Sequence, residues 1–88
     1  MRTLLALAIL AVAGPAFAGP HCTSEPRSNW QPKDAFKKKI VSASEYKVAV
    51  FKVTKGNCYE IYGRDKAGKR VEVYFHPVTG AVVKSQAR

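Results

Sequence analysis

The sequence predicts an α+β fold, in which one N-terminal helix packs on a three- to four-stranded antiparallel sheet. Apolar residues first recur at helical spacing, at Phe36, Ile40 and Ala43. From Tyr46 onward they alternate with polar residues, as they do in half-buried strands. Residues 19–88 also contain no Leu and rely on Val, Tyr and Phe, which suit a pleated sheet. These observations place the helix first and a sheet after it.

Residues 1–18 are typical of a secretory signal peptide that is cleaved after Ala18. A short positive start at Arg2 precedes an apolar run over residues 4–13, and Ala16 and Ala18 provide the small residues of a cleavage site. A membrane anchor is the alternative, but a membrane span needs about 20 apolar residues. We therefore expect residues 19–88 to lie in the periplasm or to be secreted.

Residues 19–31 are polar and contain two prolines, so we expect an extended N-terminal arm. A helix is expected over residues 32–42, because Pro32 suits the first helical position and Asp34 favours the positive end of the helix dipole. Phe36 and Ile40 then form one narrow apolar stripe toward the sheet.

Four strands are expected to follow, joined by turns at residues 54–57, 65–69 and 77–80. They are expected over residues 46–53, 58–64, 70–76 and 81–84. Gly68 should adopt a positive φ in its turn. The first strand is apolar on both faces, so we expect it to be central or partly covered. The domain then spans residues 32–84, and residues 85–88 form a C-terminal tail.

The two cysteines are expected to form a disulfide. In an oxidising compartment, Cys22 and Cys58 favour a bridge over two free thiols, although the second alternative stays open. The sequence has neither a C-x-x-C motif nor clustered metal-ligand spacing, so we expect no cofactor and no metal site.

Alternation along the strands assigns side chains to two faces of the sheet. Five should point toward the helix: Tyr59, Ile61, Val71, Val73 and Phe75. The opposite face, called the outer face here, should carry a candidate binding surface of Glu60, Tyr62, Arg64, Glu72, Tyr74 and His76. Tyr62 and Tyr74 should be cross-strand neighbours. Cys58 falls on this face too, so the arm with Trp30 is expected to cross part of it.

Several of these residues together resemble the PepSY domain family in a small exported form. The resemblance rests on residues 59–62 (YEIY), 65–74 (DKAGKRVEVY) and 77–80 (PVTG) and covers residues 30–84. The family usually has Asp where His76 stands, and often Glu where Ala81 stands. The resemblance implies a non-catalytic module. Related domains occur in the propeptides of thermolysin-like metallopeptidases and in envelope proteins.

Catalysis and metal binding are weaker alternatives. His21, His76, Glu60 and Glu72 are the acid–base groups that a secreted ribonuclease would need. No motif pairs a nucleophile with a base, however, and a His at a strand end is more often solvated. We therefore do not expect an enzyme.

The basic charge is the third feature that bears on function. The chain has 15 Lys and Arg against 6 Asp and Glu, for a net charge of +9. The basic residues include two local clusters: Lys37, Lys38, Lys39, Lys66, Lys69 and Arg70. Export disfavours nucleic acid as the partner, which leaves anionic lipid, glycan or an acidic protein surface. A merely solvated face explains the charge equally well.

The sequence thus predicts a non-catalytic module that binds an envelope protein or peptidase through Tyr62 and Tyr74. The alternatives are an accessory or sensor subunit of a membrane respiratory or signalling complex, and a binder of anionic envelope surfaces. The oligomeric state is not predicted.

Overall fold

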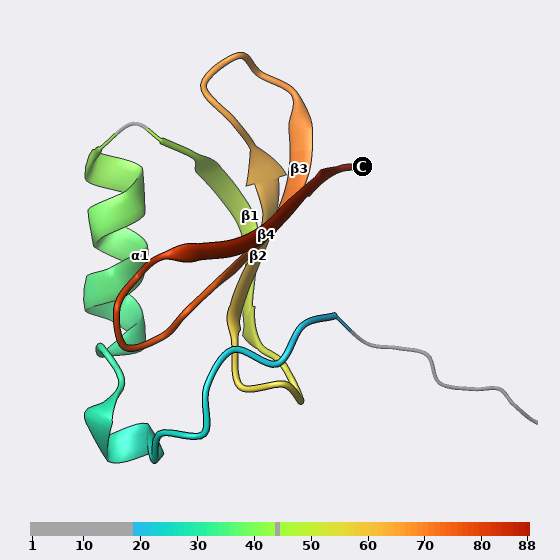
Figure 1. Cartoon of the computed structure of the whole chain (residues 1–88). Coiled ribbons are helices and arrows are strands. Elements are labelled where there is room, and N and C mark those ends of the chain that lie inside the picture. The colour runs from blue at the N-terminus through green and yellow to red at the C-terminus, as the bar shows by residue number, and fades with distance from the viewer. Residues whose placement is uncertain (1–18, 44) are drawn as a thin grey trace, which may run out of the picture.

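A computed structural model describes residues 19–43 and 45–88, so the expected signal peptide lies outside the described residues. The described elements are the 3-10 turn η2 (Arg27–Asn29), the helix α1 (Lys33–Ser42) and the strands β1 (Lys47–Val53), β2 (Tyr59–Arg64), β3 (Arg70–Phe75) and β4 (Val82–Ala87). The strands form one antiparallel meander in the order β1-β2-β3-β4, with α1 lying against one face (Figure 1). The expected α+β fold is confirmed.

The core lies between α1 and the inner face of the sheet. All five side chains expected to face the helix are buried there: Tyr59, Ile61, Val71, Val73 and Phe75. From α1, Phe36 inserts its ring against Tyr59 and Phe75, with both centroid distances at 5.2 Å. Ile40 is also buried, whereas Ala43 is exposed, so the apolar stripe of α1 is one turn shorter than expected.

Strand β1 lies at the edge of the sheet, so of the two expected alternatives the central position was wrong, whereas partial cover of the strand is present. It pairs with β2 alone, and a register shift between Val48 and Val50 interrupts that pairing. Its inner-face residues Phe51 and Val53 pack against the core, while Val50 on the other side stays exposed. β1 is apolar on both faces because one face packs on the core while the other exposes Val50 to solvent.

Strand β4 extends through residues that were expected to form the C-terminal tail. Val71 pairs with Ala87 and Glu72 with Gln86, and Arg88 N donates to Arg70 O. Every residue of β4 is exposed, so backbone hydrogen bonds, not apolar burial, hold it to β3. Strand propensity and alternation reveal little about such a strand, which explains why its end was misplaced.

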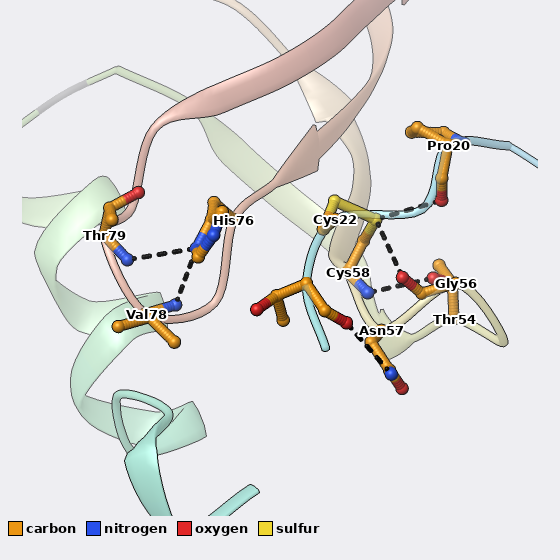
Figure 2. Close-up of a disulfide and its surroundings, with 10 residues drawn as sticks. Pro20, Cys22, Thr54, Gly56, Asn57, Cys58, His76, Val78 and Thr79 are labelled. Carbon is orange, nitrogen blue, oxygen red and sulfur yellow. Dashed lines mark hydrogen bonds between the residues drawn. A yellow bond between two sulfur atoms is a disulfide. The ribbon is translucent and has the colours of Figure 1, made fainter. Parts of the chain in front are cut away.

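The N-terminal arm wraps around the end of the sheet that carries the β1–β2 turn. The Cys22–Cys58 disulfide is present, with a Cα–Cα distance of 5.1 Å (Figure 2). In addition, Cys22 N donates to Gly56 O at 2.8 Å. A Cβ at Gly56 would lie 2.2 Å from Pro20 O, so only glycine lets the arm approach this turn. The arm is therefore fixed by covalent, hydrogen-bonded and steric contacts.

Trp30 does not cross the outer face as expected. The arm passes through η2 before the helix begins, and this carries Trp30 to the inner side of the sheet. There its ring meets Tyr59 edge-on at 5.5 Å, and its Nε1 donates to Glu25 O at 3.0 Å. Only residues at the start of the arm, around Gly19, reach the outer face.

Candidate functional site

The strand register places the candidate residues of the outer face in cross-strand rows. One row joins Val50, Tyr62, Glu72 and Gln86, and the next joins Lys52, Glu60, Tyr74 and Lys84. Tyr62 therefore lies opposite Glu72, not opposite Tyr74 as expected, and the two tyrosines are diagonal neighbours. The rows bring two carboxylates and two phenols together near the middle of the face.

Glu60 and Tyr74 are buried, which corrects their expected exposure. Glu60 is 3 % exposed and Tyr74 is 7 % exposed. Gly19 of the arm lies on the Tyr74 ring, where an added Cβ would come within 2.7 Å. Both side chains are therefore largely hidden from solvent, and the protein's own arm lies over Tyr74.

Glu60 and Glu72 form an asymmetric carboxyl pair. Glu72 accepts hydrogen bonds from Tyr74 Oη at 2.8 Å and from Gln86 Nε2 at 2.9 Å. Glu60 has only a long ion pair to Lys52, at 3.9 Å, and among the described residues its Oε2 has no partner. Burial, and after it the neighbouring carboxylate of Glu72, raises the pKa of Glu60 to about 7. The neighbouring Glu60 carboxyl is in turn the largest cause that lowers the pKa of Glu72.

Tyr62 is the half-buried aromatic residue at the surface of this face. Its ring lies between two cations, with Lys52 Nζ 4.8 Å and Arg88 Cζ 4.0 Å from the centroid. Lys52 Nζ also donates to Tyr62 Oη at 3.3 Å. Aromatic rings flanked by cations are common in recognition surfaces because they combine apolar area with charge.

The remaining two candidates lie away from this centre. Arg64 is exposed, and its Nη1 donates to Gly68 O in the β2–β3 turn, where Gly68 has the expected positive φ of 81°. His76 follows β3, and its Nδ1 accepts from Val78 N at 3.2 Å and Thr79 N at 3.3 Å (Figure 2). The imidazole thus caps the turn that follows β3.

Two hollows accompany these residues. One, of about 400 Å³, lies between the β1–β2 turn and the side chains of Glu60, Glu72 and Tyr74. The other, of about 510 Å³, is lined by apolar residues and by four cations: Lys47, Arg64, Arg70 and Arg88.

The basic clusters expected from the sequence lie on separate elements. Lys37, Lys38 and Lys39 belong to α1, whereas Lys66, Lys69 and Arg70 belong to the β2–β3 hairpin. Arg70 alone among them lines the larger hollow, together with Lys47 and Arg88, which the sequence analysis missed. Strand parity could have placed Lys47, but the pairing of Arg88 needed the true extent of β4.

Within residues 19–43 and 45–88, no three His, Cys, Asp or Glu side chains gather as metal ligands. Likewise, no helix in this part of the chain has the length and apolar character needed to cross a bilayer.

Comparison with protein families identifies the family of this chain. The family described as peptidase propeptide and YPEB domain, PepSY_2, matches residues 2–86. The chain belongs to this family. The PepSY resemblance is thereby confirmed over nearly the whole sequence. Comparisons with curated proteins and with solved structures gave no match.

Proposed function

We propose that this PepSY protein is a non-catalytic binding module of the cell envelope that modulates a peptidase or another envelope protein. The family description names a peptidase propeptide, which supports a protein partner. The observation that carries the proposal is the outer face, where α1 is absent and Tyr62 lies between Lys52 and Arg88. Such a surface offers an aromatic anchor with a charged rim, as protein interfaces do.

Three of the four candidate acid–base groups, His76, Glu60 and Glu72, have structural roles, which supports a non-catalytic module. His76 Nδ1 is occupied by two backbone amides of its own turn. Glu60 is buried, and Glu72 is engaged by Tyr74 and Gln86. We infer that these groups maintain the fold of the outer face.

Export to the envelope is part of the same proposal. The apolar N-terminal segment and the Cys22–Cys58 disulfide support it, since disulfides persist in oxidising compartments. Edman sequencing of the purified chain is expected to begin at Gly19.

Site-specific photocrosslinking in living cells tests the proposed docking face. A photoreactive phenylalanine derivative replaces Tyr62, and the matched control replaces Val41, which is 47 % exposed on α1. We expect position 62 to yield a crosslinked envelope protein, identified by mass spectrometry, that position 41 does not yield. The same adduct should disappear when unlabelled wild-type protein is overproduced. Equal crosslinking at both positions, or none at position 62, would contradict the proposal.

A further inference from the structure

Four cations form a continuous row at one end of the outer face, three of them on β1, β2 and β3 and the fourth directly after β4. Lys47 pairs with Arg64, Arg64 pairs with Arg70, and Arg88 N donates to Arg70 O at 3.1 Å. Paired residues in antiparallel strands point to the same face. The four side chains therefore line the same hollow, of about 510 Å³, and are called the cation row here.

The cation row is unfavourable for the isolated fold. Like charges directly opposite one another destabilise a sheet. In the part of the chain that the structure describes, the only side-chain ion pair joins Lys52 to Glu60, so no carboxylate is ion-paired with the row. Glu72 is close enough for the charge of Arg88 to help lower its pKa, but it does not contact the row directly. Arg64 Nη1 donates to Gly68 O, and Arg88 stacks on Tyr62, but neither contact removes charge. An anionic ligand would remove this repulsion.

The hollow also has apolar walls, which restrict what that anion is. Val50 and Tyr62 line it beside the cations, so a ligand with apolar groups next to its charges fits better than a bare anion. Its volume is that of a small-ligand pocket, enough for a few side chains. Arginine recognises carboxylates through two parallel N–H bonds, and two or three such forks are present here.

The distribution of charge favours a short acidic peptide over a membrane or a long polyanion. Glu72 lies in the row next to the cation row on the same face and would repel a polyanion that ran along the whole sheet. The basic residues of α1 lie in the other layer, so a flat bilayer cannot meet both basic regions at once (Figure 1).

We propose that the cation row binds an acidic, partly apolar segment of the partner protein, with its carboxylates on Arg64, Arg70 and Arg88 and an apolar side chain against Val50 and Tyr62. This inference rests on the proposed docking function of the outer face and names the chemistry of the partner.

Fluorescence anisotropy with a synthetic peptide tests the proposal. The probe is a fluorescein-labelled octapeptide of alternating Glu and Val, and its counterpart carries Gln in place of Glu. We expect the wild-type protein to bind the Glu peptide and not the Gln peptide. The Arg70→Gln/Arg88→Gln variant should bind at least about tenfold more weakly, because two charge-assisted contacts are lost.

The matched control is Lys37→Gln/Lys38→Gln, which removes the same charge from α1. It should change affinity by no more than about twofold, since screening weakens distant charges. Equal losses in both variants would show a net-charge effect and overturn the proposal. So would binding of phosphatidylglycerol vesicles that is lost in the Arg70→Gln/Arg88→Gln variant while peptide binding persists.

Two further measurements separate recognition from folding and from the docking proposal itself. The Tm of Arg70→Gln/Arg88→Gln should equal or exceed that of the wild type, because repulsion is removed; a Tm that falls with affinity would overturn the inference.

If photocrosslinking at position 62 persists in this variant and the Glu peptide does not bind, the docking face stands and the cation row fails. If the peptide binds but no crosslink forms, the docking proposal fails instead.

Discussion

At the scale of single residues, the outer face depends on how Glu60 and Glu72 divide their protons. Both come from neighbouring strands, yet only Glu72 receives hydrogen bonds from Tyr74 and Gln86. Glu60 is buried with an unpartnered oxygen, so its neutral form is favoured and its pKa rises to about 7. Glu60 is thus the carboxyl that holds a proton more readily, and Glu72 is the one that stays ionised.

The raised pKa of Glu60 predicts a specific dependence of stability on pH. The folded protein holds this proton more tightly than the unfolded chain, whose value is the ordinary 4.5. The stabilisation from Glu60 is therefore complete below about pH 4.5 and is lost as the pH rises through 7. We expect Glu60→Gln to be more stable than wild type by roughly 1–2 kcal/mol at pH 8, with little difference near pH 4.5. Urea unfolding across this range measures it.

Glu72→Gln is the matched control, and it should lower stability at pH 8, because an ionised acceptor of two hydrogen bonds is removed. A stability gain for Glu60→Gln that is the same at pH 4.5 and pH 8 would disprove the proton assignment.

The hydrogen bonds of His76 predict a second effect of a single residue on stability. Its Nδ1 accepts two amide hydrogens of the 77–80 turn, as a carboxylate of Asp would at the same place. We expect His76→Ala to lower the free energy of unfolding by about 1 kcal/mol, whereas His76→Asp should keep wild-type stability. Chemical denaturation of both variants decides the matter. Equal destabilisation by Ala and Asp would mean that the cap has no energetic role.

At the scale of elements, the N-terminal arm acts as a cover for one end of the outer face. Cys22 is bonded to Cys58 at the start of β2, Asn57 Nδ2 donates to Thr23 O, and Gly19 lies against Tyr74. The arm then crosses to the inner side, where Trp30 completes the core. A single segment therefore contributes to both faces of the sheet, although it forms no strand.

Loss of the disulfide should release this arm. The bridge closes a loop with a sequence separation of 36 residues. On the loop-entropy model it contributes about 4 kcal/mol, and we expect Cys22→Ser/Cys58→Ser to lose up to that amount. Hydrogen exchange should then accelerate most at residues 19–24 and at Tyr74, and least at Ile61 and Val73 in the core. Uniform acceleration over the whole chain would show that the arm is not an independent unit.

At the scale of the whole molecule, positive charge is the dominant feature. Residues 19–88 retain fourteen of the fifteen basic residues, spread over the arm, the helix, the turns and the outer face of the sheet. A compact state with such an excess repels itself. The cation row concentrates this repulsion because its members are nearest neighbours across the strands.

Added salt should therefore stabilise the protein. Between about 20 and about 300 mM NaCl, the screening length shortens markedly, so repulsion between the cations weakens and the Tm is expected to rise. The rise should be smaller in Arg70→Gln/Arg88→Gln than in Lys37→Gln/Lys38→Gln, because only the first variant breaks the row. Thermal unfolding followed by circular dichroism provides the measurement, and identical salt responses of the two variants would contradict the role given to the row.

Much of the fold could be predicted because its signals are local. Periodicity placed Phe36 and Ile40 on the buried side of α1 and gave the inner face of β2 and β3, and the two cysteines formed the expected bridge. The end of β4 could not be predicted, because the residues of this strand are all exposed and are held by backbone bonds to β3. Which side chains of the outer face are exposed was only partly predictable. The arm covers Tyr74 and leaves Tyr62 accessible, and strand alternation alone does not show where the arm lies.

The sequence by itself determined the elements, the two faces of the sheet and the family, because hydrophobic alternation and turn residues act over a few neighbouring positions. Only the tertiary structure decided which polar groups are buried and which cations become neighbours. Glu60 became a carboxyl without a partner on one oxygen, and Lys47, Arg64, Arg70 and Arg88 became one row, because strand register joins residues that are far apart in the chain.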